Sequence, residues 1–204
     1  MRILVTGGTG MVGSCFKKYE DEDIIRIGSS DCNLMDESEC DRLFRDIKPD
    51  SVIHLAARVG GVKGNTDYMG DFYFQNIKIN TNVLEFARVY NVKKAVSLLS
   101  TCIYPDDVIY PLTEDQIHNG PPHTSNFGYA YAKRMLDIQS KAYRQQYDCN
   151  FITAVPNNLF GENDNFDLEN SHVIPAIIRK VYEAKNSNKP YITLWGDGTP
   201  LREF

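Results

Sequence analysis

Short runs of aliphatic residues alternate along the chain with longer segments whose apolar residues recur every three or four positions. The short runs predict buried β-strands and the longer segments predict amphipathic helices. Strands are expected at residues 3–5, 24–27, 51–55, 95–99, 151–155 and 191–195, and helices at 11–19, 36–47, 71–90, 128–147 and 173–184. Residues 58–70 contain four glycines and are expected to form a loop. This alternation predicts an α/β fold, a doubly wound parallel sheet with helices on both faces.

The first strand ends in a glycine-rich turn that leads directly into a helix. Its glycines fit two overlapping spacings, Gly7-x-x-Gly10-x-x-Gly13 and Gly8-x-Gly10-x-x-Gly13. Without a Cβ in the way, the backbone N–H groups of such a turn can reach a pyrophosphate, and the positive end of the helix dipole faces that anion. The strand before the glycines and the helix after them are the context that this motif requires. The chain is therefore predicted to bind a dinucleotide in a Rossmann-type fold.

The tip of the second strand bears on which dinucleotide is bound. In this fold the tip meets the adenosine ribose, where an acidic residue favours NAD and repels the 2′-phosphate of NADP. Ser29 and Ser30 occupy the tip and Arg26 is nearby, which favours NADP. Asp31 follows one residue later, and an acidic residue there would favour NAD, so NAD remains an alternative cofactor.

Composition and charge limit the other classes of function. The 204 residues are 42% apolar and 24% charged with a net charge of −5, which is typical of a globular protein and argues against binding to nucleic acid. No apolar stretch has the roughly 20 residues of a membrane span, and no secretory signal opens the chain. Five widely spaced cysteines without a C-x-x-C pair indicate reduced thiols in the cytoplasm. Neither a disulfide framework nor a metal site is expected.

Two tyrosines precede a lysine by four residues, a spacing that places both side chains on one face of a helix. In the pair Tyr129 and Lys133, the ammonium is expected to favour the phenolate and lower the tyrosine pKa. This pair follows the loop after the fourth strand, where Ser100 stands and where a substrate carbonyl would arrive. Tyr90 and Lys94 lead into that strand instead, at the edge of the sheet away from the cofactor. Tyr129 and Lys133 are thus the expected acid–base pair.

Three features resemble the extended short-chain dehydrogenase/reductases, which use NAD(P) and act mostly on nucleotide sugars. They are TGGTGMVG near the N-terminus, Ser100 after the fourth strand and YAYAK at 129–133. Other segments resemble the GDP-L-fucose synthase branch of that family: HLAARVGG (54–61), STCIYP (100–105), NNLFGENDNF (157–166), NSHVIPA (170–176) and WGDGTPLREF (195–204). The resemblance implies a cytoplasmic, homodimeric, NADP(H)-dependent enzyme. Such an enzyme epimerises GDP-4-keto-6-deoxy-D-mannose at C3 and C5 and then reduces C4 to give GDP-L-fucose.

The resemblance also assigns roles to the residues that could do this chemistry. Epimerisation beside a ketone needs a base on one face and an acid on the other, roles that the resemblance gives to Cys102 and His172. Taken alone, Cys102 would be interpreted as a small buried hydrophobic residue and His172 as a capping or surface histidine. For the reduction, Tyr129 would donate the proton, Ser100 would hydrogen-bond the same oxygen, and Lys133 would tune Tyr129 and hold the nicotinamide ribose.

Binding residues are implied by the same resemblance. The implied cofactor contacts are Gly7, Gly8, Thr9, Gly10, Met11, Val12, Gly13, Ser29, Asn33, Leu34, Ala56, Ala57, Leu98, Leu99, Ser100, Thr101, Tyr129, Lys133, Pro156, Asn157, Asn158, Leu159 and His172. The implied substrate contacts are Asn158, Lys180, Trp195 and Arg202. Thr9 and Ser29 depart from the family, which commonly has arginine-type contacts to the cofactor phosphate there.

The resemblance divides the chain after residue 161. Residues 1–161 would form the NADP-binding domain, and residues 162–204 the start of a small C-terminal substrate-binding lobe. Because the chains of this family continue beyond the REF segment at 202–204, the present chain is expected to be a fragment. Two other interpretations remain open. One is another nucleotide-sugar epimerase or dehydratase of the same family, and the other is a dinucleotide-binding fragment without turnover.

Overall fold

The computed structural model describes residues 1–19, 23–199, 201 and 204. Its strands are β1 (Ile3–Thr6), β2 (Ile24–Ile27), β3 (Ser51–His54), β4 (Lys94–Leu98) and β5 (Phe151–Ala154). Its α-helices are α1 (Met11–Ser14), α2 (Glu37–Ile47), α3 (Val62–Asp67), α4 (Met69–Val89), α5 (Phe127–Tyr147) and α6 (Val173–Asn186). Short 3₁₀ turns lie at Cys15–Lys18, Thr101–Ile103, Glu114–Gln116 and Thr124–Asn126. The structure thus confirms the alternation of strands and helices through the fifth strand.

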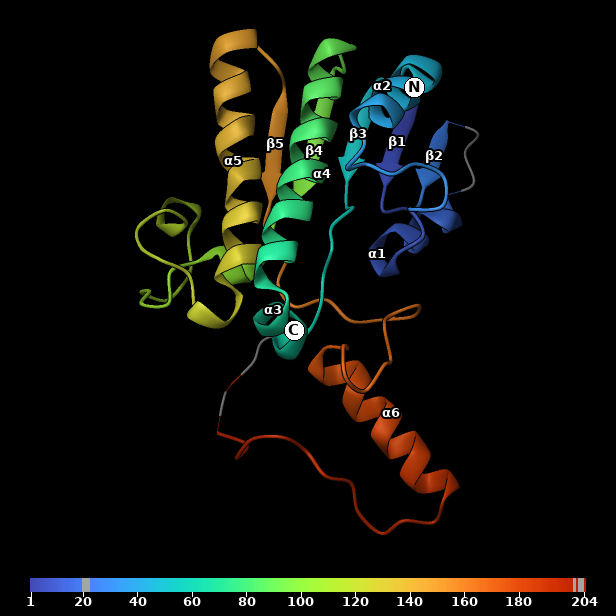
Figure 1. Ribbon diagram of the computed structural model, residues 1–204, viewed down its shortest axis with the longest axis vertical. Helices are drawn as coiled ribbons and strands as arrows, with labels where there is room; N and C mark the ends of the chain where they lie inside the picture. Colours follow the sequence, from blue (N-terminus) through green and yellow to red (C-terminus); the bar gives the residue numbers. More distant parts are fainter. Residues whose placement is uncertain (20–22, 200, 202–203) are drawn as a thin grey trace.

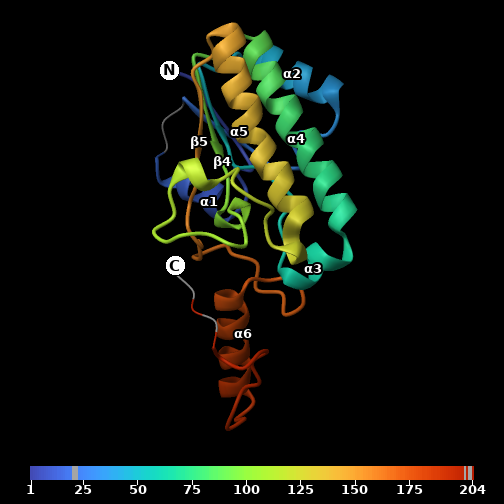
Figure 2. The same cartoon turned by 90° about the vertical axis from the view of Figure 1, so that its left-hand side faces the viewer.

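All five strands are parallel, in the order β2-β1-β3-β4-β5. From β1 the chain adds β2 on one side. It then crosses β1 and adds β3, β4 and β5 in turn on the other side, so the winding reverses between β1 and β3. Right-handed crossovers place α1 on one face of the sheet and α2, α4 and α5 on the other. Figures 1 and 2 show α4 and α5 side by side across that second face. In folds of this kind a ligand binds at the carboxyl ends of the strands, at the point where the winding reverses.

The face covered by α2, α4 and α5 holds the main core. Leu4, Val52 and Phe151 project from three different strands and are at most 1% exposed. Phe44 of α2 and Phe86 of α4 lie above them with ring centroids 6.4 Å apart. Burial of each of these side chains contributes about 2 kcal/mol. The core therefore fixes the helices, and the residues they carry, relative to the carboxyl edge of the sheet.

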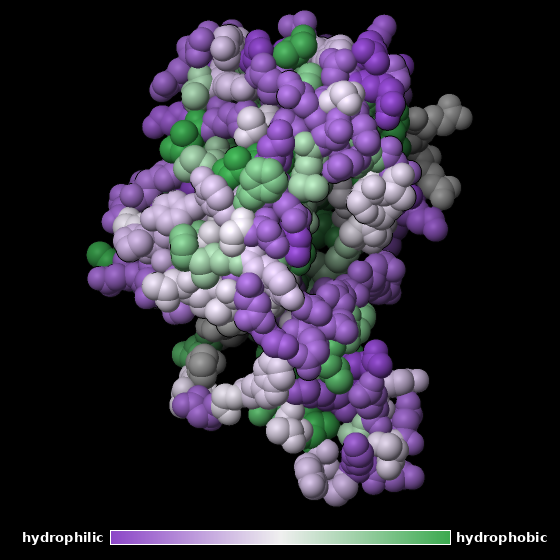
Figure 3. Space-filling model, viewed as in Figure 1, coloured by the Kyte–Doolittle hydropathy of each residue, from purple (hydrophilic) through white to green (hydrophobic). Residues whose placement is uncertain are grey.

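Helix α6 lies beyond the carboxyl edge and projects away from the sheet (Figure 1). Its Val173 and Tyr182 are 51% and 63% exposed, so this helix buries little of its apolar surface. Hydrophilic side chains dominate the visible surface of the body that contains the sheet (Figure 3). In the part of the chain that the structure describes, no helix combines the length and apolar character needed to cross a membrane.

Two helical regions differ from the prediction. Helix α1 ends at Ser14, and a 3₁₀ turn replaces the expected continuation to residue 19. The Ser14 hydroxyl donates to the Met11 carbonyl at 2.8 Å and so competes with the helical backbone. Residues 58–70, predicted as a loop, contain α3 and the start of α4. The side-chain amide of Asn65 donates to the carbonyls of Gly60 and Gly61 at 2.7 and 3.1 Å, which stabilises the turn that begins α3.

The strand predicted at residues 191–195 is wrong. These residues form irregular structure outside the sheet, and Tyr191 is 76% exposed. An apolar β-branched run becomes a strand only where a neighbouring strand accepts and donates its backbone hydrogen bonds. Here the carbonyl of Thr193 accepts a hydrogen bond from the Lys180 ammonium at 2.8 Å instead.

Polar side chains cross the buried face of the sheet in one hydrogen-bonded row. Thr6 Oγ1 lies 2.7 Å from His54 Nδ1, and His54 Nε2 lies 3.1 Å from Asn80 Oδ1. The Asn80 amide nitrogen donates in turn to the Ala132 carbonyl at 3.0 Å. Burial, and then the charge of Lys133, lowers the pKa of His54 to about 3, so the ring is neutral. With its proton on Nε2, His54 connects β1 and β3 to both α4 and α5.

We expect folding stability to depend on the protonation of His54. Its folded-state pKa of about 3 is below the ordinary 6.5, so the unfolded chain binds this proton more readily. The free energy of unfolding should therefore fall as the pH drops from about 6.5 toward 3, by up to about 1.4 kcal/mol per pH unit. Urea unfolding at pH 7 and pH 5 measures this loss. His54→Gln should reduce it and the exposed His123→Gln should not; equal losses in all three proteins would contradict the prediction.

Candidate functional site

The glycine turn between β1 and α1 is packed against neighbouring backbone. The Gly8 amide donates to the Ile27 carbonyl at 2.7 Å, which holds the turn against the end of β2. A Cβ on Gly8 would lie 2.5 Å from the Arg26 Cβ, and a Cβ on Gly13 would lie 2.2 Å from the Gly7 oxygen. Gly7 has a φ of +68°, in the left-handed region that favours glycine. The packing of this chain therefore requires glycine at these three positions.

Gly10 begins α1 as its N-cap residue, in an extended conformation. No side chain caps this end of the helix by a hydrogen bond. The first N–H groups of a helix have no partner within it, and here they belong to the predicted contacts Met11 and Val12. These groups lie at the point where the winding of the sheet reverses, so they can receive an anionic ligand.

The end of β2 lies beside the glycine turn and carries the groups that would meet the adenosine. Arg26 Nη1 donates to a carbonyl of the turn at 3.1 Å, which holds a positive charge there. Asp31 accepts the Gly28 amide at 2.7 Å, so this carboxylate closes its own turn. Ser29 is exposed, and a Cβ on Gly28 would lie 2.4 Å from Thr9 Oγ1. Beside the glycine turn, Arg26 therefore presents a positive charge. The carboxylate of Asp31 is held by the Gly28 amide.

The other predicted cofactor contacts follow the carboxyl edge of the sheet. Asn33 and Leu34 follow β2, and Ala56 and Ala57 follow β3. Leu98 is the last residue of β4 and is followed by Leu99, Ser100 and Thr101, and Pro156, Asn157, Asn158 and Leu159 follow β5. The side chains of Leu34 and Leu99 are 8% and 4% exposed and belong to the core. Only the backbone of these two residues could face a cofactor. Asn158 and Leu159 are exposed.

Lys133 reaches from α5 back to the end of β4. Its Nζ donates to the Leu98 carbonyl at 2.8 Å and lies 6.0 Å from the centre of the Tyr129 ring. Lys133 is 2% exposed, and burial lowers its pKa to about 8. The ammonium is therefore mostly charged at pH 7 and is fixed beside the predicted proton donor.

Tyr129 differs from the prediction in its acidity. Burial, and then the Cys102 thiol, raises the pKa of Tyr129 above its ordinary value, whereas the sequence predicted that Lys133 would lower it. Burial dominates because the phenol loses contact with water, and the Lys133 ammonium is directed to the Leu98 carbonyl. At neutral pH the phenol is thus protonated, which suits a proton donor and not a base.

Cys102 lies in the 3₁₀ turn Thr101–Ile103, directly after Ser100. Burial raises the pKa of its half-buried thiol. A hydrogen bond with Ser100 and the positive charges of Lys133 and Arg134 act in the opposite direction. The structure therefore brings four predicted catalytic residues together at the end of β4: Ser100, Cys102, Tyr129 and Lys133.

His172, the fifth predicted catalytic residue, begins α6 as its N-cap and is exposed. Its side chain makes no capping hydrogen bond, so the imidazole is not tied to its own helix end. The segment before it is attached to the start of α3, where the Gly61 amide donates to the Asn170 carbonyl at 3.2 Å. Lys63 pairs with Glu169 at 2.8 Å in the same region. Helix α3 thus anchors the segment that leads to His172.

Two predicted substrate contacts, one on α6 and one in the segment after it, lie close together. Lys180 Nζ lies 5.3 Å from the centre of the Trp195 ring, within the range of a cation–π contact. Trp195 is 72% exposed, so a cation and an open aromatic ring are presented together. Arg202, another predicted substrate contact, lies outside the described residues.

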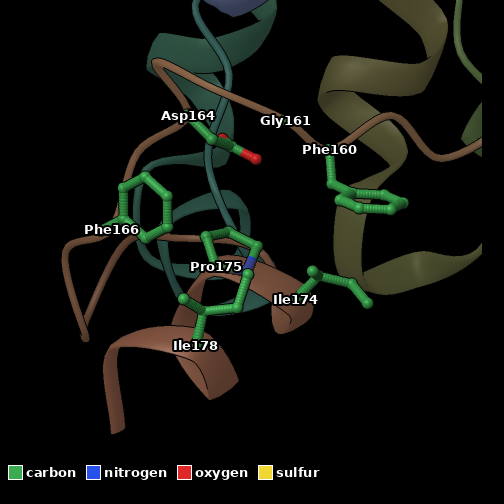
Figure 4. Close-up of a pocket in the computed structure, with 7 residues that line it drawn as sticks. All are labelled: Phe160, Gly161, Asp164, Phe166, Ile174, Pro175 and Ile178. Atoms are coloured by element: carbon green, nitrogen blue, oxygen red, sulfur yellow. The ribbon is translucent and has the colours of Figure 1, made fainter. Parts of the chain in front are cut away.

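A cavity of about 190 Å³ lies between α6 and the segment that follows β5. Figure 4 shows its lining, which is Phe160, Gly161, Asp164, Phe166, Ile174, Pro175 and Ile178. Asp164 is the one charged residue of that lining, and none of the predicted contacts belongs to it. The lining of the cavity is mainly apolar.

The chain resembles known proteins over nearly its whole length. Residues 3–204 match the model of the NAD dependent epimerase/dehydratase family. The chain belongs to this family. A GDP-L-fucose synthase of Dictyostelium discoideum is 49% identical over 99% of this chain and 65% of its own length. A GDP-L-fucose synthase of Escherichia coli is 36% identical over 100% of this chain and 64% of its own length.

Solved structures share the fold. A GDP-L-fucose synthetase of Naegleria fowleri bound to NADP has a TM-score of 0.90 and 41% identity, over 98% of this chain and 67% of that one. A UDP-glucose 4-epimerase of Thermus thermophilus in complex with NAD has a TM-score of 0.73 at 23% identity, which shows a common fold. The chain described here spans about two thirds of the length of the curated relatives that it matches.

Several residues that support this site were not predicted. His54 could have been noticed as a polar residue within an apolar strand, a pattern typical of a hydrogen-bonded buried group. Gly61 stands in a glycine-rich segment, but nothing in the sequence shows that its Cβ would lie 2.9 Å from the Ser171 oxygen. Arg134 is 3% exposed, although an arginine after Lys133 on a helix gives no sign of burial.

We expect Gly13→Ala to disturb the glycine turn, because the added Cβ would lie 2.2 Å from the Gly7 oxygen. Such overpacking should destabilise the fold by about 1–3 kcal/mol and weaken binding of a dinucleotide. Gly70→Ala is the matched control, since Gly70 also lies in a helix and nothing surrounds its Cβ position within 4 Å. Urea unfolding and fluorescence titration with NADPH measure both effects. Wild-type binding by Gly13→Ala would contradict the prediction.

Proposed function

We propose that the protein is an NADPH-dependent enzyme that converts GDP-4-keto-6-deoxy-D-mannose to GDP-L-fucose. It would epimerise C3 and C5 and then reduce the ketone at C4. The observation that carries this proposal is the group Ser100, Cys102, Tyr129 and Lys133 at the end of β4, on the same carboxyl edge of the sheet as the glycine turn. The names of the Dictyostelium, Escherichia coli and Naegleria relatives support it. Because the chain spans about two thirds of those relatives, the proposal concerns the whole protein.

The residues at the carboxyl edge fit NADP(H). The glycine turn and the open N-terminus of α1 suit the pyrophosphate. Arg26 supplies positive charge at the adenosine end, and the nearby Asp31 is engaged by the Gly28 amide. The Naegleria structure bound to NADP adds support. When bound, the cofactor supplies the hydride that reduces C4.

The residues of α5 and β4 would complete the reduction. The raised pKa of Tyr129 keeps its phenol protonated, so it can give a proton to the C4 oxygen. Ser100 would donate a hydrogen bond to the same oxygen. Lys133 is held by the Leu98 carbonyl at 2.8 Å and would stabilise negative charge on the phenol as the proton leaves. Its remaining N–H groups can hold the ribose hydroxyls.

Cys102 and His172 would carry out the epimerisation. A proton next to a ketone is acidic enough for a positioned thiolate to remove, and the positive charges of Lys133 and Arg134 favour that thiolate. His172 is exposed at the start of α6 and would return a proton from the other face. The attachment of the preceding segment to α3 supports this placement.

The division of the chain is part of the same proposal. Residues 1–161 would bind the cofactor, and residues 162–204 would begin the substrate-binding lobe. In the second segment, Lys180 would meet the diphosphate and Trp195 would pack against the nucleotide, and their contact at 5.3 Å supports a shared role. Arg202 would be a further contact.

We infer a cytoplasmic homodimer. The five cysteines are free thiols, which suits a reducing compartment. The outer surface of α4 and α5 carries exposed apolar side chains, among them Phe74 at 62% and Ile138 at 43%. Two such surfaces could pack on each other.

A second candidate is another nucleotide-sugar enzyme of this family. A GDP-L-colitose synthase of Yersinia pseudotuberculosis is 36% identical, and a GDP-6-OMe-4-keto-L-xylo-heptose reductase of C. jejuni is 30% identical. These names show that similar chains handle different GDP sugars. A chain that binds the dinucleotide without turnover is the remaining alternative.

The deciding experiment follows NADPH oxidation with GDP-4-keto-6-deoxy-D-mannose in D₂O. We expect the intact protein to form GDP-L-fucose with deuterium at C3 and C5. Cys102→Ser should lose deuterium incorporation and C3/C5 inversion by at least about 100-fold, because the serine hydroxyl is a far weaker acid than the thiol. Cys149→Ser is the control. NADPH binding without oxidation would contradict the proposal, and full inversion by Cys102→Ser would remove the role of the cysteine.

Tyr129→Phe should separate reduction from epimerisation. Without the phenol, NADPH oxidation should fall by about 10²–10⁴-fold, while deuterium exchange into the sugar continues. Tyr90→Phe is the matched control from the second Tyr–Lys spacing. The Tyr90 hydroxyl donates to Asp41 at 2.7 Å and should affect only stability. A Tyr129→Phe enzyme that reduces at the wild-type rate would exclude the tyrosine as proton donor.

A further inference from the structure

Arg134 is the residue after Lys133 on α5, and it is 3% exposed. A guanidinium loses hydration when it is buried, so its presence in the interior calls for hydrogen bonds that replace water. In the proposed site Arg134 contributes its charge near Cys102, and its own hydrogen bonds have no assigned role. Its hydrogen-bond partners show what holds this charge in the interior.

The guanidinium joins two segments that are distant in sequence. Its Nε donates to the Ile103 carbonyl at 2.6 Å, and its Nη1 donates to the Gly120 carbonyl at 2.7 Å. Ile103 ends the single 3₁₀ turn that contains Cys102. The guanidinium carbon of Arg134 lies 5.2 Å from the centre of the Tyr131 ring, so a cation–π contact adds to the two hydrogen bonds. Rotation of Arg134 away from this position would release the turn.

The charge of Arg134 is not neutralised by these partners. Both acceptors are backbone carbonyls, and Nη2 is buried without a hydrogen-bond partner among the described residues. A positive charge thus remains directly behind the turn that carries Cys102.

We propose that Arg134 is a positioning residue for Cys102, which fixes the turn that carries the thiol and directs an un-neutralised positive charge toward it. The proposal rests on the proposed function, in which Cys102 is the base. A thiolate must be present at the right place before it can take a proton from carbon. Arg134 serves both requirements without touching the substrate.

Among the groups around the Cys102 thiol, Arg134 differs from Lys133 in the pH range over which it is charged. The titratable groups that act on Cys102 come from α5 and are Tyr129, Lys133 and Arg134, with Ser100 bonded to the thiol from its own segment. Burial raises the pKa of Cys102, and Lys133 and Arg134 oppose it. The pKa of Lys133 is about 8, so its charge is lost as the pH rises through that range. Arg134 keeps its charge over that range and is therefore the permanent source of positive charge near the thiol.

The test measures the pH profile of Cys102 alkylation by iodoacetamide, read by peptide mass spectrometry in the intact protein with Cys15→Ser and Cys149→Ser. We expect Arg134→Met to move the midpoint up by about one pH unit, which slows alkylation at pH 7 about tenfold. Arg134→Lys keeps the charge but not the two-pronged hydrogen bonding, so its midpoint should stay within about half that shift. An unchanged midpoint in Arg134→Met would overturn the proposal.

Arg144→Met is the matched control. Arg144 also lies on α5 and also donates to a backbone carbonyl, that of Phe151, but it is ten residues from Arg134. Its removal should leave the alkylation profile unchanged. A shift in Arg144→Met as large as in Arg134→Met would show a general effect of destabilising α5 and would overturn the proposal.

If Arg134→Met does not fold, the kinetics of Arg134→Lys decide. We then expect a fall of at least about tenfold in deuterium incorporation at C3 and C5, with the NADPH dissociation constant within twofold of wild type. Unchanged incorporation would overturn the proposal. The alkylation profile needs no sugar substrate. Failure of GDP-L-fucose formation would therefore contradict the proposed function and leave the effect of Arg134 on the thiol measurable.

Discussion

The hydrogen-bonded row through His54 is the constraint on which the rest of the structure depends. A neutral imidazole between Thr6 and Asn80 connects the two central strands to α4, and Asn80 connects α4 to α5 at the Ala132 carbonyl. Each buried polar group in the row finds its partner in another element, so none of β1, β3, α4 and α5 can shift without leaving a group unsatisfied. Ala132 precedes Lys133 directly, and the row therefore sets the height of α5 against the sheet. That height determines whether Lys133 reaches the end of β4.

Close approach of backbone to backbone is a second constraint, at the glycine turn between β1 and α1. The turn between β1 and α1 contacts the ends of β2 and β3 at distances that no Cβ allows, as the positions of Gly7 and Gly8 show. The turn is thereby fixed at the point where the winding of the sheet reverses. Anion-binding amides thus lie on one side of this point, and the α5 side chains lie on the other. A dinucleotide bound across the carboxyl ends of the strands would place its reactive end near Tyr129.

Buried positive charge distinguishes the α5 side of the site. Lys133 and Arg134 are consecutive, both at most 3% exposed, and their hydrogen bonds go to backbone carbonyls. Carbonyl partners replace water but leave the charge in place, and this charge favours any anion that forms nearby. The thiolate of Cys102 and the phenolate left by Tyr129 after proton transfer would both be such anions. One short stretch of helix could thus serve two chemical steps.

The sequence by itself determined the α/β alternation, the dinucleotide turn and the positions of most helices, because these depend on local periodicity and on glycines at fixed spacing. It also supplied the Tyr129–Lys133 pair, since four residues on a helix define one face. It could not show the burial that raises the pKa of Tyr129, the 3₁₀ turn after Ser14, or the helix within residues 58–70. The apolar run at 191–195 lacked a strand to pair with, and the buried position of Arg134 depends on carbonyls 14 and 31 residues away. Such features arise from contacts between distant segments, and only the tertiary structure decides them.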